Sequence, residues 1–130
     1  MRIREIRPGW VVRRGDMYLA NLNPCTGSEQ GGTRPVLVLQ NNDENFYCPT
    51  LIVAPMTTQI KKLNQPTHYL IKHNCALSAP SMVGFEQIKT IDKSRIKGYL
   101  GKLTKEQLGE IDDYLKISLG MYIPETVEAP

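Results

Sequence analysis

The sequence predicts a mainly β protein with some α structure: a small β-barrel or sandwich that ends in one helix. Three observations support this prediction. Short runs rich in β-forming residues follow one another, with turn residues about every 8–12 positions. Near the C-terminus the apolar residues recur instead at steps of three and four, which is typical of a helix. The chain has 130 residues, enough for one domain but few for the long parallel crossovers of a Rossmann-type enzyme.

Six runs have the composition of strands: Met17–Leu22, Pro35–Gln40, Leu51–Met56, Thr67–Lys72, Ser81–Thr90 and Arg95–Leu100. The second and third runs are almost wholly apolar, so we expect both of their faces to be buried. Pro55 would place the end of the third run at a sheet edge or a bulge. Polar or glycine-containing stretches predict loops at Cys25–Thr33, Asn41–Pro49 and Lys61–Pro66.

The end of the domain has the pattern of an amphipathic helix of about four turns. Its apolar stripe, which should face the barrel, consists of Leu108, Ile111, Leu115 and Leu119. Thr104 and Gln107 form a capping-box pattern at its start, and Gly120 suits a C-terminal cap.

Charge and composition divide the chain into three parts. Residues 1–12 form a basic extension, which we expect to be flexible or to add an edge strand through Trp10–Val12. Residues 13–120 form the domain, and residues 121–130 form a tail in which Pro124 stops further helix. The formal net charge is +3, from 16 basic and 13 acidic residues. That value is compatible with a polyanionic partner but does not require one.

Composition argues against several classes of protein. Hydrophobic residues make up 41% and charged residues 22%, so wholesale disorder is excluded. Cys25, Cys48 and Cys75 form no CxxC pair, and we therefore expect no zinc knuckle, no disulfide framework and a reducing, cytoplasmic location. We expect no signal peptide and no membrane span, because no apolar run approaches roughly 20 residues. His68 and His73 lie in no cluster with ligand spacing, so we expect no metal and no cofactor.

The densest polar cluster is the glycine-rich stretch from Gly27 to Pro35. It contains Ser28, Glu29, Gln30 and, directly before a buried strand, Arg34. Glycines let a bulky ligand approach the backbone, and arginine pairs with phosphate through two parallel hydrogen bonds. The stretch therefore indicates a phosphate site, although a surface loop with an internal Glu–Arg ion pair would have the same composition.

Two further polar clusters lie at or within expected strands. Thr57-Thr58-Gln59 ends a buried strand, where the threonines could donate hydroxyl groups or serve only as β-formers. Phe85-Glu86-Gln87 falls inside the fifth run, where strand alternation would put Phe85 and Gln87 on one face. That face could line a groove or simply be solvated.

Five blocks of the sequence, in order from about Arg13 to Gly120, closely resemble the MazF/PemK toxin family: Arg14–Ala20, Gly27–Val38, Pro49–Thr57, Leu63–His68 and Glu86–Lys93. The resemblance implies the SH3-like barrel that these toxins share with CcdB-type toxins, and a homodimer. It implies a metal-independent endoribonuclease that cleaves single-stranded RNA through attack by the ribose 2′-hydroxyl. It also implies a cognate MazE-like antitoxin, whose acidic tail occupies the RNA groove and with which the toxin binds DNA as a complex.

The resemblance also assigns residues. The family's catalytic arginine and threonine match Arg34 and Thr57, and Glu29 matches a residue that either acts as general base or positions the arginine. The substrate-binding candidates are Ser28, Gln30, Gln59 and Gln87, whose side chains suit the edges of unstacked bases. Two alternatives stay open: a CcdB-like toxin that binds DNA gyrase, and an RNA-binding barrel without catalysis.

Overall fold

The computed structural model describes residues 3–122, which form an antiparallel β-sheet, two α-helices and two short 3-10 helices. The strands are β1 (Asp16–Asn21), β2 (Thr33–Val38), β3 (Thr50–Thr57), β4 (His68–Ile71), β5 (Ser81–Gly84), β6 (Lys89–Asp92) and β7 (Ile96–Lys102). The helices are α1 (Asn42–Tyr47), η1 (Phe85–Gln87), η2 (Lys93–Arg95) and α2 (Lys105–Ser118). The predicted mainly β domain with a C-terminal helix is confirmed.

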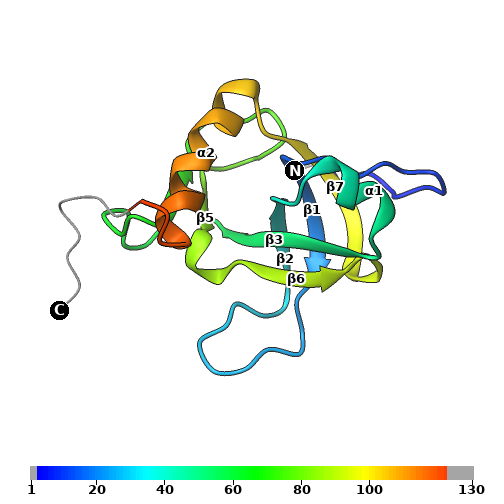
Figure 1. Ribbon diagram of the computed structural model, residues 1–130, viewed down its shortest axis with the longest axis horizontal. Helices are drawn as coiled ribbons and strands as arrows, with labels where there is room; N and C mark the ends of the chain where they lie inside the picture. Colours follow the sequence, from blue (N-terminus) through cyan, green and yellow to red (C-terminus); the bar gives the residue numbers. More distant parts are fainter. Residues whose placement is uncertain (1–2, 123–130) are drawn as a thin grey trace.

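The seven strands form one antiparallel sheet in the order β4-β5-β3-β2-β1-β7, with β6 paired to β3 off this path. The sheet curves strongly, so that β1, β2, β3, β6 and β7 form the wall of a small barrel. Helix α2 covers one side of this barrel (Figure 1). The β1–β2 loop projects away from the barrel at the bottom of this view.

Strand β3 changes partner along its length. Its residues Thr50–Val53 pair with β6, and Met56 and Thr57 pair with β5. Pro55, which has no N–H to donate, lies between these two segments. On the opposite side of β3, Pro55 pairs with Val36 of β2. The proline therefore marks a change of pairing near the end of the strand, where the sequence predicts an edge or a bulge.

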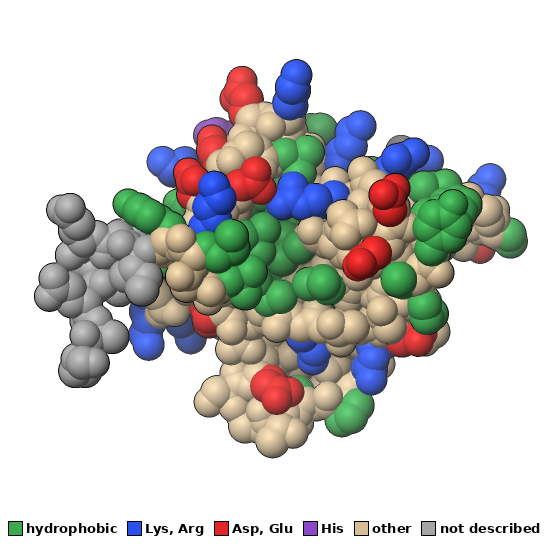
Figure 2. Space-filling view, viewed as in Figure 1, with side chains coloured by type: hydrophobic (Ala, Val, Ile, Leu, Met, Phe, Trp, Pro, Cys, Tyr) green, Lys and Arg blue, Asp and Glu red, His purple; other side chains and the backbone are tan. Residues whose placement is uncertain are grey.

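Apolar side chains form two core clusters. One packs against α2 and contains the fully buried Met17, Leu37 and Phe85. The other contains Tyr18, Val36 and further β-branched residues, and packs against the N-terminal segment. Burial on two sides agrees with the expectation for the apolar runs of β2 and β3. Apolar side chains also reach the surface between α2 and the middle of the sheet (Figure 2).

Helix α2 begins as the sequence predicts. Thr104 accepts a hydrogen bond from the Gln107 N–H, and the Gln107 side chain accepts one from the Thr104 N–H. Ile111 is fully buried in the first core cluster, with Leu108 and Leu115 packed beside it. The prediction that Leu119 completes the apolar stripe is wrong: this residue is the C-cap and is 64% exposed.

The described part of the N-terminal extension lies against β7. The backbone of Arg4 pairs with Tyr99 through two hydrogen bonds of 2.8 Å, so the edge contact forms there and not through Trp10–Val12 as expected. The Trp10 indole donates to the Tyr18 hydroxyl at 2.8 Å, which in turn donates to Asp16 Oδ2 at 2.7 Å. Burial raises the pKa of the Asp16 carboxyl above its ordinary value.

Two local predictions are wrong. The stretch Asn41–Pro49 contains helix α1, whose start is capped by the Asn41 side chain accepting from the Glu44 N–H at 2.9 Å. The run Ser81–Thr90 is two strands, because η1 interrupts it at Phe85–Gln87. Consequently Phe85 and Gln87 do not share a strand face: Phe85 is fully buried, and Gln87 points to a surface groove.

Candidate active site

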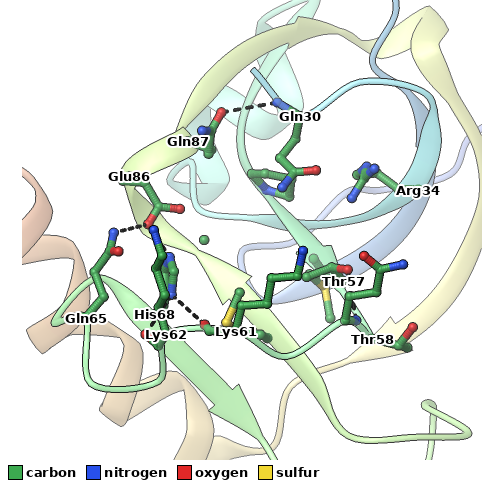
Figure 3. A pocket seen from close by; sticks show the side chains of 15 residues that line it. Gln30, Arg34, Thr57, Thr58, Lys61, Lys62, Gln65, His68, Glu86 and Gln87 are labelled. Carbon is green, nitrogen blue, oxygen red and sulfur yellow. Dashed lines mark hydrogen bonds and ion pairs between the residues drawn. The ribbon is translucent and has the colours of Figure 1, made fainter. Parts of the chain in front are cut away.

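A groove of about 470 Å³ lies beyond the ends of β2 and β3. The β1–β2 loop, the β3–β4 loop and η1 form its walls (Figure 3). Five of the seven site residues predicted from the sequence line this groove: Gln30, Arg34, Thr57, Gln59 and Gln87. Side chains from three separate segments of the sequence are thus brought to one surface.

Sheet pairing explains why Arg34 and Thr57 meet. Val36 of β2 lies opposite Pro55 of β3, and the antiparallel register, continued by two residues, puts Arg34 opposite Thr57. A step of two residues keeps a side chain on the same face of a strand. Both positions therefore continue one row of side chains past the buried core into the groove.

The Arg34 side chain is anchored at only one of its nitrogens. Its Nε donates to the Gly31 carbonyl oxygen at 2.9 Å. Within residues 3–122 the guanidinium makes no ion pair, and its two terminal nitrogens have no protein partner. A guanidinium held in this way presents a rigid pair of donors to the groove.

Thr57 has a hydroxyl that is free to donate. Its Oγ1 accepts a hydrogen bond from the Gln59 N–H at 3.1 Å, which leaves its proton available to a ligand. The turn that follows β3 creates this contact and directs the exposed Gln59 side chain to the rim of the groove.

Glu29 and Ser28 do not line the groove. Both are exposed on the β1–β2 loop, and Glu29 Oε1 accepts from the Thr26 N–H at 3.2 Å. The Glu–Arg ion pair considered for this loop is not formed, since Arg34 contacts the Gly31 carbonyl instead.

The β1–β2 loop is held to the groove by Gln87. The Gln87 side-chain oxygen accepts from the Gln30 N–H, and its amide nitrogen donates to the Ser28 carbonyl, each at 3.3 Å. At the other side of the loop, Arg95 donates to the carbonyl oxygens of Asn21 and Asn23. In this structure Gln87, which the sequence predicts to contact substrate, positions the loop.

Sequence reasoning missed the opposite wall of the groove. His68 and Glu86 form an ion pair of 2.7 Å between Nε2 and Oε2, and Lys61 and Lys62 stand beside it. In Figure 3 the pair lies across the groove from Arg34 and Thr57. The signal that could have identified His68 is its place at the end of the block Leu63–His68, but in the sequence it lies far from every other polar cluster.

Metal-binding and membrane-spanning features are absent from the described part of the chain. Among residues 3–122, no three His, Cys, Asp or Glu side chains gather closely enough to hold a metal ion. None of the helices described is both long and apolar enough to cross a membrane.

The chain is similar to toxins of known structure. A family model described as a PemK-like, MazF-like toxin of a type II toxin–antitoxin system matches residues 13–119. MazF from Deinococcus radiodurans is 27% identical, with a TM-score of 0.74 over 86% of this chain and 99% of that one. MazF in a MazE–MazF complex from the same organism is also 27% identical, with a TM-score of 0.68 over 87% and 99%. A mycobacterial endoribonuclease bound to its cognate antitoxin has the same fold, at 24% identity and a TM-score of 0.72 over 88% of this chain and 100% of that one.

Proposed function

The chain belongs to the PemK-like, MazF-like toxin family of type II toxin–antitoxin systems, and on that premise we propose that it is a metal-independent endoribonuclease that cleaves single-stranded RNA in the cytoplasm. The observation that carries the proposal is the convergence of Arg34 and Thr57 on one groove, where the terminal nitrogens of Arg34 and the hydroxyl proton of Thr57 have no partner within residues 3–122. A protein that acted only by binding gyrase would not need such a pair.

The proposed reaction uses the substrate's own nucleophile. The ribose 2′-oxygen attacks the adjacent phosphorus, the bond from phosphorus to the 5′-oxygen breaks, and a 2′,3′-cyclic phosphate and a 5′-hydroxyl result. Negative charge builds up on the phosphoryl oxygens in the transition state. The terminal nitrogens of Arg34 and the hydroxyl of Thr57 would donate to those oxygens, where fixed donors are most effective.

Two proton transfers complete the reaction: the 2′-hydroxyl must lose its proton, and the departing 5′-oxygen must gain one. We assign the first to Glu29 as general base, whose carboxylate contacts the Thr26 N–H outside the groove and whose side chain would have to turn inward, and solvent water protonates the 5′-oxygen. Gly27 and Gly32 flank this segment with φ values of +58° and +75°, conformations that glycine adopts without strain. Glu29→Gln should therefore alter the pH dependence of cleavage while leaving RNA binding intact.

The remaining polar residues suit a single RNA strand. Gln30, Gln59 and Ser28 offer amide and hydroxyl groups of the kind that read the edges of unstacked bases. Lys61 and Lys62 add positive charge along the same groove, where a phosphate backbone would release counterions.

The proposed protein partners are a MazE-like antitoxin and a second copy of the chain. The MazE–MazF complex of Deinococcus radiodurans supports the first partner, because its MazF aligns with 87% of this chain. An exposed apolar surface at the end of α2 supports a homodimer: Leu119, Met121 and Tyr122 are between 56% and 73% exposed. In such a system the antitoxin would cover the groove and bind DNA together with the toxin.

One assay separates the alternatives. Purified protein is incubated with a long single-stranded RNA in EDTA, and the products are mapped by primer extension and tested for a cyclic phosphate. Cleavage in EDTA is expected. Intact RNA with tight binding would instead indicate a non-catalytic RNA-binding barrel, and cleavage only after Mg²⁺ is added would refute metal independence. Thr57→Val, which removes the hydroxyl but keeps the side-chain shape, should cut poorly, whereas the matched Thr57→Ser should retain most activity.

A further inference from the structure

His68 connects the two segments that form one wall of the groove. Its Nε2 lies 2.7 Å from Glu86 Oε2 on η1, and its Nδ1 lies 3.1 Å and 3.0 Å from the carbonyl oxygens of Lys61 and Lys62 on the β3–β4 loop. Only 10% of the His68 side chain is exposed. The imidazole therefore bridges η1 and the loop, beside the direct hydrogen bonds that Gln65 and Thr67 make to Glu86.

Every partner of the imidazole is a hydrogen-bond acceptor. Two carbonyl oxygens face one nitrogen, and a carboxylate faces the other. A neutral imidazole carries one N–H, so it could donate on only one side, whereas the imidazolium donates on both. The complete set of contacts thus corresponds to the charged form of His68.

The residues around Glu86 keep its carboxylate in contact with His68. Its Oε2 also accepts from the Thr67 hydroxyl at 2.8 Å and from the Gln65 amide at 3.0 Å. Gly84, the cross-strand neighbour of His68, leaves the necessary space, because a Cβ at that position would lie 2.6 Å from Glu86 Oε1. Four residues from three elements are arranged around one carboxylate.

The loop that His68 holds carries two charges of the groove. The backbone carbonyls of Lys61 and Lys62 contact the imidazole, and both side chains line the groove. On the groove side, the charged groups around His68 are Glu86 on η1, the two lysines on the loop and Arg34 across the groove on β2 (Figure 3). On its other side, His68 lines a second depression with Lys72, His73, Glu106 and Glu110.

We propose that His68 is a positioning residue: its imidazolium clamps the β3–β4 loop to η1 and so holds Lys61 and Lys62 along the RNA groove. The inference rests on the proposed function only for the identity of the ligand. Loss of the proton removes one side of the clamp, so the protein should bind RNA more tightly when His68 is charged than when it is neutral.

The clamp itself is tested on the free protein, without RNA. Hydrogen exchange over residues 58–67 is compared in the wild type, His68→Gln and the matched control His73→Gln, which alters an exposed histidine outside the groove. Faster exchange confined to this loop in His68→Gln is expected. Unchanged exchange there, or a ¹⁵N spectrum in which His68 never carries two N–H protons between about pH 5 and about pH 8, would overturn the clamp.

The consequence for the substrate is tested by steady-state cleavage across the same pH range. His68→Gln should raise KM by about three- to tenfold at the acidic end and leave kcat nearly unchanged. The reason is that Lys61 and Lys62 bind phosphates of the substrate backbone in the wild type and would be displaced from them in the variant. Its KM should also lack the pH dependence that the wild type and His73→Gln retain. Gly84→Ala, which displaces the Glu86 carboxylate without altering His68, should reproduce the rise in KM.

The outcomes separate the two proposals. A fall in kcat with constant KM would mean that His68 takes part in the chemistry and would overturn the positioning role. Failure of the wild type to cleave any RNA would refute the proposed function, whereas the exchange and ¹⁵N measurements would still decide whether the clamp exists.

Discussion

Replacing Arg34 tests the centre of the proposed site. The side chain donates from Nε to the Gly31 carbonyl oxygen at 2.9 Å and leaves two terminal nitrogens for the phosphate. Removing a single donor from a transition-state site typically lowers kcat by about 10²–10³. Arg34→Ala removes two donors and their charge, so we expect kcat to fall by at least about 10³. Arg34→Lys restores one charged donor without the planar fork, and a fall of about 10² is expected.

The surroundings of Arg34 also limit how far Arg34→Ala can lower the free energy of unfolding. Arg34 is half-buried, and its one intramolecular hydrogen bond contributes about 1 kcal/mol to the free energy of unfolding. The alanine variant should therefore stay folded, with a decrease of only a few degrees in Tm, about 3–6 °C. Loss of activity with retained structure is the signature of a residue that acts on the substrate.

Single-turnover cleavage of a defined RNA in EDTA measures the effect on the chemical step, and circular dichroism checks the fold. Arg13→Ala is the matched control, because it removes the same charge from an exposed position outside the groove. If Arg34→Ala cut RNA within about tenfold of the wild-type rate, the assignment of Arg34 to the phosphate would be refuted.

Three further variants test the core packing, the loop contacts and the buried carboxyl that support the site. Ile111→Ala should lower the free energy of unfolding by about 2–5 kcal/mol in urea titrations, because it opens a cavity at a fully buried position between α2 and the sheet. Gln87→Ala should accelerate hydrogen exchange in the β1–β2 loop and lower kcat/KM by about tenfold, since it removes both of the side-chain hydrogen bonds from Gln87 to that loop; equal exchange would mean that the loop holds itself. Asp16→Asn tests the buried carboxyl. Burial raises its pKa, so the folded chain binds that proton more tightly than the unfolded chain, and the stability from this group falls as pH rises above 3.8, the ordinary value. The asparagine variant should lack this fall when stability is measured against pH, and an identical pH profile would contradict it.

Local patterns predict those parts of the fold in which neighbouring residues determine the structure. The capping box at Thr104 and the apolar spacing of Leu108, Ile111 and Leu115 predict α2, because each residue contacts others within one or two turns. Leu119 follows the same spacing but is exposed, since the helix ends before it can reach the sheet.

The errors arise where distant contacts outweigh local preference. The run Ser81–Thr90 has the composition of one strand, but β3 accepts β5 and β6 at different points along its length, and η1 provides the step between them. Periodicity in a single run carries no information about that change of partner.

Prediction of the site shows the same limit. Arg34 and Thr57 can be found because each directly adjoins a recognisable strand, and pairing of those strands brings them together. The contact between His68 and Glu86 depends on β4, β5 and η1 all being in place, so no segment of the sequence contains it. Likewise, the double contact of Gln87 with the β1–β2 loop follows from η1, which the strand prediction lacked.

The order of the strands has a consequence for synthesis of the protein. Strand β1 pairs with β7, the last strand among residues 3–122, and the Ser118 hydroxyl near the end of α2 donates to the Phe85 carbonyl of η1 at 2.6 Å. A nascent chain, which lengthens at about 5–20 residues per second, cannot form either contact until β7 and α2 have emerged from the ribosome. The strands that carry Arg34 and Thr57 are therefore synthesised well before the contacts that close the sheet and hold η1 can form.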